Sequence, residues 1–290
     1  MLHFVRGFLM GSADVVPGVS GGTVALIVGI YPRLISNIRR GAGVLSAFVR
    51  LRFSEGFERL RSIEWGFLLP LLAGMAVALV TLARVIEHFL EDYPVELSAL
   101  FFGLVFASVF VAGKMVSNWD RLRMVTFIVV AVGAFFLLGL RSGEAENPAT
   151  WIFFVAGAVA ICAMILPGVS GSFLLLMLGM YEAVLAAVND REYLVLLLVI
   201  LGAVVGLALF SSVLHWALDT YHDLVMAAIT GLLLGSLRVL WPWPNGIDGP
   251  ELSGPIADEF AAPFLLAVVG AGLVFLITRL GTDSEPVAAE

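Results

Sequence analysis

The chain has 290 residues, of which 60% are hydrophobic and only 13% are charged, and its formal net charge is −7. Soluble domains carry about 45–50% apolar and about 25% charged residues, so this composition excludes a soluble globular domain and predicts an integral membrane protein. A single cysteine, Cys162, excludes an intramolecular disulfide and a multi-cysteine metal centre. The scattered histidines predict no metal site and no cofactor, and the acidic balance argues against a nucleic-acid partner.

Six stretches are long and apolar enough to cross a membrane, which takes about 20 predominantly apolar residues. They are Trp65–Glu87, Ser98–Val116, Leu122–Arg141, Tyr193–Trp216, Leu224–Trp241 and Ala262–Leu280. Two further apolar regions, Phe4–Tyr31 and Trp151–Val188, are each interrupted near the middle by the sequence Pro-Gly-Val-Ser-Gly. The arms that remain are too short for simple crossings on at least one side, so we predict half-helices or re-entrant hairpins there.

The distribution of arginine predicts the orientation in the membrane. Seven arginines lie in the Pro32–Glu64 connection, and cytoplasmic loops are the ones enriched in basic residues. If this connection is cytoplasmic, the Lys114–Arg123 turn is also inside, and the acidic loops His88–Leu97 and Pro242–Phe260 are outside. Both termini are then cytoplasmic. We also expect the arginine-rich connection to contact anionic lipid.

The two interrupted regions are copies of one another. Val15–Tyr31 reads VVPGVSGGTVALIVGIY, and Ile165–Tyr181, 150 residues later, reads ILPGVSGSFLLLMLGMY. A second matching block, which includes Gly74 and Gly202, aligns at an offset of 128, because the first half has the longer arginine-rich connection. We therefore divide the chain into a first repeat, residues 1–145 with the connection at 32–64, and a second repeat, residues 146–290.

Three predicted spans separate the two breaks, and an odd number of crossings inverts the second repeat relative to the first. The predicted fold is an all-α polytopic membrane protein with an inverted internal repeat. Each half is a re-entrant helical hairpin, broken at Pro-Gly, followed by three transmembrane helices. Inverted repeats with broken helices at corresponding positions indicate the substrate site of a transporter.

The breaks have the chemistry of an anion site. A proline ends one helix, and the following serine stands where the N-cap of the next helix belongs. A new helix start leaves backbone N–H groups unpaired, and its positive end attracts an anion. We predict that a phosphate or carboxylate is held between two such starts, by Ser20, Gly21, Gly22, Thr23, Ser170, Gly171 and Ser172. The helix-breaking residues are Pro17, Gly18, Pro167 and Gly168.

Five ionisable residues in apolar surroundings are candidates for coupling or gating: Arg6, Asp14, Arg84, Glu87 and Arg238. An ionisable residue inside a membrane segment is a functional hypothesis by default. Simpler interpretations stay open. Arg6 and Asp14 lie on much the same helical face, where they would neutralise each other. The other three lie near the outer face, where long side chains either snorkel to the interface or capture phosphate.

Three alternatives compete with the anion site. The breaks could be packing kinks, where small residues let helices approach closely, although their duplication favours a binding site. The same cage would also serve a secondary transporter of a small soluble anion. Finally, Gly-x-Ser-Gly occurs in intramembrane serine proteases, with His215 as the partner for Ser170, but the motif is duplicated and the histidine is not.

The sequence RGFLMGSADVVPGVSGGTVALIVGIY, beginning at Arg6, and its copy CAMILPGVSGSFLLLMLGMY, beginning at Cys162, resemble the polyprenyl-phosphate transporter family of prokaryotic membrane proteins. The resemblance implies a plasma-membrane flippase, not an enzyme. Its partner would be undecaprenyl phosphate, the lipid carrier for cell-envelope synthesis, or another polyprenyl phosphate in an archaeon. The second copy has Ser172 and Phe173 in place of Gly22 and Thr23, so exact mirror symmetry of the ligand shell is not expected.

This substrate suits the predicted site. Only the phosphate needs polar contacts, while the prenyl tail can stay in lipid through a lateral opening, and rocking of one repeat against the other would give alternating access. The chain contains no GxxxxGK[ST] phosphate-binding loop, so the energy must come from a gradient or from consumption of the product. The prenyl length, the coupling ion and the choice between monomer and homo-oligomer stay open.

Overall fold

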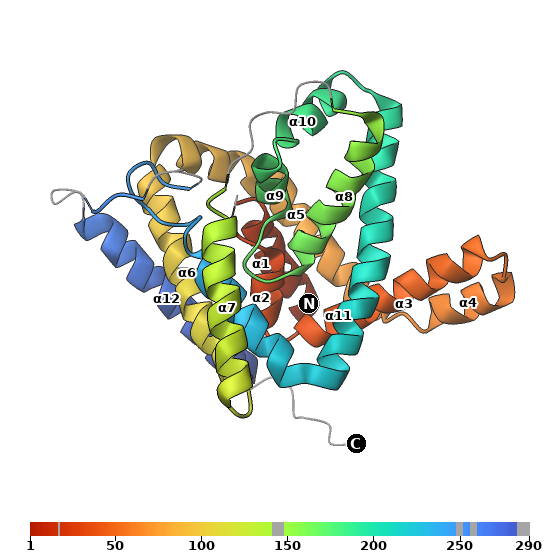
Figure 1. The fold of residues 1–290 in the computed structure, drawn as a ribbon, viewed down its shortest axis with the longest axis horizontal. Helices are drawn as coiled ribbons and strands as arrows, with labels where there is room; N and C mark the ends of the chain where they lie inside the picture. Colours follow the sequence, from red (N-terminus) through yellow and green to blue (C-terminus); the bar gives the residue numbers. More distant parts are fainter. Residues whose placement is uncertain (17, 141–147, 248–251, 256–259, 283–290) are drawn as a thin grey trace.

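The computed structural model describes residues 1–16, 18–140, 148–247, 252–255 and 260–282. Every regular element among these residues is an α-helix (Figure 1). Four helices are long and apolar enough to cross a membrane, namely α5 (Trp65–Asp92), α6 (Pro94–Lys114), α11 (Tyr193–Ser236) and α12 (Ala261–Thr282). The prediction of an all-α multi-pass membrane protein is therefore confirmed.

The remaining helices are shorter. They are α1 (Leu2–Asp14), α2 (Gly21–Ile27), α3 (Tyr31–Val49), α4 (Phe53–Arg61), α7 (Arg121–Leu137), α8 (Thr150–Ile165), α9 (Gly171–Met177) and α10 (Tyr181–Asn189). The pair α9 and α10 is apolar enough to count as one broken span or re-entrant loop, with a bend of 110°. Helix α7 accounts for the predicted Leu122–Arg141 stretch up to Leu137, and Arg141 lies outside the described residues.

Helix α11 consists of two helical parts that meet at a kink. Tyr221 has non-helical backbone angles there, with φ −131° and ψ 43°. Tyr93, at the turn between α5 and α6, has nearly the same angles, with φ −137° and ψ 51°. The two parts of α11 correspond to the predicted stretches Tyr193–Trp216 and Leu224–Trp241, and the turn between them is visible at the lower end of α11 in Figure 1.

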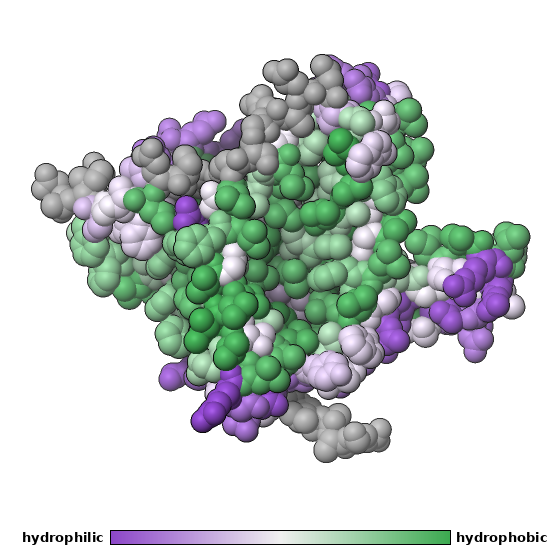
Figure 2. All heavy atoms as spheres, in the orientation of Figure 1, coloured by the Kyte–Doolittle hydropathy of each residue, from purple (hydrophilic) through white to green (hydrophobic). Residues whose placement is uncertain are grey.

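The outer surface has the character of a membrane protein. Figure 2 shows a broad apolar band across the middle of the molecule, with hydrophilic residues gathered at its upper and lower ends. Large apolar side chains such as Val80, Phe136 and Leu209 are exposed. Apolar surface of this extent is stable against lipid rather than against water.

Glycines bring helices of the first half into close contact, and their counterparts repeat this in the second half. Helix α1 crosses α5 at Gly74, where an added Cβ would clash with the backbone carbonyl of Phe4. Helix α8 crosses α11 at Gly202, where an added Cβ would clash with the carbonyl of Phe154. Phe154 corresponds to Phe4 at the offset of 150, and Gly202 corresponds to Gly74 at the offset of 128. Small residues at such crossings let membrane helices pack backbone to backbone.

The later helices also pack as corresponding pairs. Gly103 of α6 meets the carbonyl of Ala267 in α12, and Gly231 of α11 meets the carbonyl of Phe127 in α7. Gly103 and Gly231 are equivalent positions of the repeat. In both crossings the last helix of one half, α7 or α12, packs against a helix of the other half. The helix order and these crossings agree with the predicted duplication. The inversion of the second repeat stays a prediction, and the boundary at 145/146 lies outside the described residues.

The two halves differ in the arginine-rich connection. Helix α3 has 19 residues and its counterpart α10 has nine, while α4 has no counterpart among the described helices. Together α3 and α4 form a hairpin that projects from the body of the molecule (Figure 1). In contrast, α2 lies inside the main apolar core, and all seven of its residues are buried.

Candidate functional site: the two helix breaks

Both breaks are built from the same backbone conformations. Gly18 and Gly168 have positive φ angles, of 78° and 92°, which a side chain would strongly disfavour. Ser20 then occupies the N-cap of α2, and Ser170 occupies the N-cap of α9. Pro167 lies between α8 and α9, whereas the equivalent proline, at position 17, lies outside the described residues.

The first break is closed by the protein's own acceptors. The Gly21 amide donates to Asp14 Oδ1 over 2.6 Å, and the Gly22 amide donates to Ser20 Oγ over 3.0 Å. The Thr23 amide donates to the Ser20 carbonyl over 2.9 Å. These three amides were expected to be free for an anion, but here each has an acceptor, because an unpaired N–H inside a membrane protein is costly. One of the acceptors is a carboxylate.

The first break also contacts the second. Ser20 Oγ donates to the carbonyl of Met164, at the end of α8, over 3.0 Å. The amide of Gly168 donates to Thr23 Oγ1 over 2.9 Å. Ser20 and Thr23 are fully buried at this junction. The structure therefore places the start of α2 against the segment that ends α8 and forms the second break.

The second break is more open. The hydroxyls of Ser170 and Ser172 lie 2.8 Å apart, and Ser172 is exposed while Gly171 is half-buried. The position equivalent to Asp14 is Met164, which offers no carboxylate to the Gly171 amide. Figure 2 shows the surface hollowed between α7 and α8, over the loop that leads into α9 in Figure 1. This break therefore exposes Ser172, while the Ser170 hydroxyl beside it is buried.

The five ionisable candidates do not form one cluster. Asp14 bonds Gly21, and no ion pair joins it to the buried Arg6 within the described part of the chain. Arg84 and Glu87 are exposed on α5. Arg238, two residues beyond the end of α11, lies with its guanidinium carbon 4.8 Å from the ring centre of Phe135.

The contacts of two residues of α3, Tyr31 and Asn37, were not foreseen from the sequence. The buried Tyr31 hydroxyl donates to the carbonyl of Ile165 over 3.2 Å and adds a third link between the two breaks. The duplicated Gly-x-Tyr ending of the motif was a signal for this residue. Asn37 was not singled out at all, because a lone asparagine in a polar connection carries no distinctive pattern.

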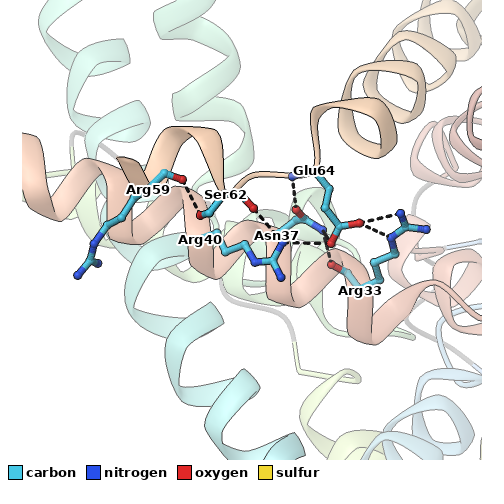
Figure 3. A network of polar contacts seen from close by, with 6 residues as sticks. All are labelled: Arg33, Asn37, Arg40, Arg59, Ser62 and Glu64. Carbon is cyan, nitrogen blue, oxygen red and sulfur yellow. Dashed lines mark hydrogen bonds and ion pairs between the residues drawn. The ribbon is translucent and has the colours of Figure 1, made fainter. Parts of the chain in front are cut away.

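Asn37 belongs to a polar network that fixes α3 to the start of α5 (Figure 3). Glu64 accepts from Arg33 over 2.7 Å, from Arg40 over 3.1 Å and from Asn37 over 3.2 Å. Asn37 Oδ1 in turn accepts from the Glu64 amide over 3.0 Å. Partial burial acts to raise the pKa of Glu64, but the hydrogen bonds from Arg33 and Asn37 and the charges of the two arginines bring that pKa below its ordinary value.

The geometry does not assemble a serine hydrolase. His215 Nε2 lies 3.2 Å from Asp219 Oδ2, and the hydroxyl of Ser170 is paired with that of Ser172. A nucleophilic serine needs a base within hydrogen-bond reach, and Ser170 has no histidine as its partner within the described residues.

Broken helices that meet inside a polytopic helical bundle are typical of membrane transporters. A family model described as VCA0040-like, undecaprenyl phosphate translocase-like, matches residues 10–253. The chain belongs to this family.

Two curated relatives carry the name polyprenyl-phosphate transporter. The one from Vibrio cholerae is 39% identical over 266 residues, which cover 90% of this chain and 85% of the relative. The one from Staphylococcus aureus is 30% identical over 258 residues, which cover 83% of this chain and 86% of the relative. No solved structure matches the chain.

Proposed function

We propose that this protein is a flippase that moves a polyprenyl phosphate across the plasma membrane of a prokaryote and holds the phosphate at the helix breaks. The relatives' names supply the substrate class. The observation that carries the site is the difference between the breaks: at the first, the Gly21 amide is bonded by the Asp14 carboxylate, and at the second, the buried Ser170 hydroxyl lies 2.8 Å from the hydroxyl of the exposed Ser172.

The physical need for such a site comes from the headgroup. A phosphate monoester carries about −1.5 to −2 charges near neutral pH, and burying such a charge in hydrocarbon without partners is prohibitive. Two hydroxyls and the amides at the start of α9 would stabilise it by charge-assisted hydrogen bonds. The prenyl tail would stay in the bilayer through the hollow between α7 and α8.

Alternating access would exchange the roles of the two breaks. In the present arrangement the Asp14 carboxylate occupies the anion position of the first break. In the opposite arrangement the phosphate would replace it on the amides of Gly21 and Gly22 and on the Ser20 and Thr23 hydroxyls. Because Asp14 would then need a proton or another partner, we assign it the coupling role. Arg6, on the same helix, would balance the local charge.

We assign the remaining cations to the entry and exit of the phosphate headgroup. Arg238 lies two residues beyond Ser236, whose hydroxyl is 3.0 Å from the position of a Cβ on Gly168. We assign its guanidinium the capture of a phosphate that enters or leaves the second break. Arg84 and Glu87 would act at the outer mouth. In this assignment both termini are cytoplasmic, and the arginine-rich hairpin faces the cytoplasm.

Leaflet exchange of a fluorescent polyprenyl phosphate in liposomes tests the proposal. We expect the reconstituted protein to accelerate exchange, and the double variant Ser170→Ala with Ser172→Ala to be slower by about tenfold or more, as expected for lost hydrogen bonds to a charged group. Ser212→Ala, which removes an exposed hydroxyl on α11 that bonds the Ala208 carbonyl of its own helix, is the matched control.

Two outcomes would overturn the proposal. Exchange that is unchanged in the double variant would exclude the second break as the phosphate site. Uptake of inorganic phosphate into the liposomes without any lipid exchange would identify a transporter of a soluble anion instead.

A further inference from the structure

The helix breaks contact the hairpin of α3 and α4 through Tyr31, at the start of α3, and the projecting part of the hairpin is not used in the proposed transport. The hairpin projects sideways from the body of the molecule (Figure 1), and the described helices of the second half form no equivalent hairpin. The segment Pro32–Glu64 contains seven arginines and three glutamates, so it is strongly basic within an acidic protein. Its two long faces differ in chemistry.

One face of the hairpin is apolar and unpartnered. Its side chains are between 40% and 75% exposed: Leu45, Val49, Leu51, Phe53 and Phe57. Figure 2 shows this face on the upper side of the projection, directed toward the level of the apolar band that surrounds the body. Because the face continues the lipid-facing surface, hydrocarbon is the medium that suits it.

The opposite face carries arginines in excess of the available carboxylates. Glu55 pairs with Arg52 and Arg59, at 3.5 and 2.6 Å. Glu64 pairs with Arg33 and Arg40 in the network of Figure 3.

Three further arginines, Arg39, Arg50 and Arg61, are exposed and have no ion pair within the described residues. This face is therefore complementary to anions.

The hairpin is held firmly in place. Phe48 of α3 packs edge to face against Phe57 of α4, with ring centres 5.6 Å apart. At its base, Phe67 of α5 lies between the Arg33 guanidinium, 4.5 Å from its ring centre, and the His3 ring, at 5.1 Å. These contacts set the orientation of the apolar and basic faces relative to α5 in the structure.

We propose that the α3–α4 hairpin lies in the membrane–water interface and binds acidic phospholipid headgroups through Arg39, Arg50 and Arg61. Its apolar face would enter the acyl region, and the guanidinium groups would reach the phosphates of the same leaflet. Amphipathic helices with a basic polar face bind anionic bilayer surfaces in this way. The hairpin would then enrich acidic lipid on one side of the transporter and on one leaflet only.

Fluorescence quenching by brominated lipids in nanodiscs tests both parts of the proposal. In a Cys162→Ala background, an environment-sensitive dye on Val49→Cys reports the apolar face and a dye on Ser54→Cys reports the polar face. We expect lipids brominated on their acyl chains to quench the dye at position 49 and to quench the dye at position 54 only weakly.

The same probe measures lipid enrichment. At equal mole fraction, brominated phosphatidylglycerol should quench the dye at position 49 about twofold or more as strongly as brominated phosphatidylcholine, and high salt should reduce the difference. Arg50→Gln with Arg61→Gln should bring the ratio to about one. Lys114→Gln with Arg121→Gln removes two exposed cations that have no ion pair among the described residues, and it should leave the ratio unchanged.

Three results would overturn the proposal. Equal quenching by the two lipids in the wild type would show that the arginines select no acidic lipid. Equal quenching at positions 49 and 54 would show that the hairpin does not lie in the interface. Protection of position 49 from both lipids would show that another protein surface, such as a second copy of this chain, covers the apolar face.

Discussion

Glu64 shows how a single charged residue at the membrane surface can fix the position of a whole hairpin. It stands at the N-cap position of α5, and its side chain accepts hydrogen bonds from Arg33, Asn37 and Arg40 on α3. Asn37 is buried and bonds Glu64 in both directions, so each residue satisfies polar groups of the other. A buried amide without such a partner would be strongly destabilising.

The lowered pKa of Glu64 leads to a pH-dependent stability. A carboxyl group whose pKa is depressed on folding contributes stability above its unfolded pKa, about 4.3, and this contribution is lost as the pH falls through the folded value. Glu64→Gln should therefore lower the thermal stability of the purified protein at pH 7 by about 1 kcal/mol. The difference from wild type should shrink below about pH 4.3 in unfolding scans. A difference that is independent of pH would contradict the charge-based explanation.

Thr23 is the residue that links the two breaks most directly, because its hydroxyl accepts from the buried Gly168 amide. Thr23→Val keeps the shape of the side chain but leaves that amide without its acceptor. The expected loss is about 1–3 kcal/mol in the free energy of unfolding. Thr23→Ser keeps the hydroxyl and should retain most of the stability. Equal loss in both variants would mean that the methyl group, rather than the hydrogen bond, matters at this site.

At the scale of whole helices, the crossings depend on glycines that leave no room for a side chain. Gly74→Ala would push its methyl group into the carbonyl of Phe4 and force α1 away from α5. We expect a destabilisation of about 1–3 kcal/mol, typical of overpacking. Gly133→Ala, in α7, has nothing within 4 Å of the new methyl group and should be neutral or slightly stabilising. Thermal unfolding in detergent compares the two, and equal effects would refute the role of the crossing.

The sequence predicted the elements well where local chemistry determines them. The N-cap role of Ser20, the short helices after each break and the long apolar helices all follow from proline, glycine and serine placement and from hydrophobic length. The Pro32–Glu64 connection was expected only as an arginine-rich segment, but it forms two helices. Its helical form depends on packing of Phe48 against α4 and on the Glu64 network, which no local pattern reveals.

The partners of the site residues could not be predicted in the same way. The sequence placed Asp14 near the first break, and we considered Arg6 as its counter-charge. In the structure its carboxylate bonds the Gly21 amide instead. The contact depends on how α1 ends and α2 begins in space, across a turn whose path the spacing of residues does not specify. The hollow at the second break likewise depends on where α7 and α8 lie in space, which local sequence does not specify.

At the scale of the molecule, the glycine crossings of the first half recur in the second half. The Asp14 carboxylate of the first break does not recur, because Met164 stands at the equivalent position. If Asp14 exchanges a proton during transport, Asp14→Asn should remove the response of leaflet exchange to a transmembrane pH difference, because asparagine can still accept from Gly21 but cannot titrate. Asp219→Asn, an exposed carboxylate paired with His215, is the control and should leave the response intact. A variant at Asp14 that still responds to the gradient would exclude it as the coupling group.

The most direct test of the phosphate site is an experimental structure of the protein with a polyprenyl phosphate bound. We expect the phosphate oxygens within about 3 Å of the Ser170 and Ser172 hydroxyls, or, in the opposite state, of Ser20 and Gly21 with Asp14 displaced. A phosphate bound only by Arg84 or Arg238 at the periphery, with both breaks closed and dry, would contradict it.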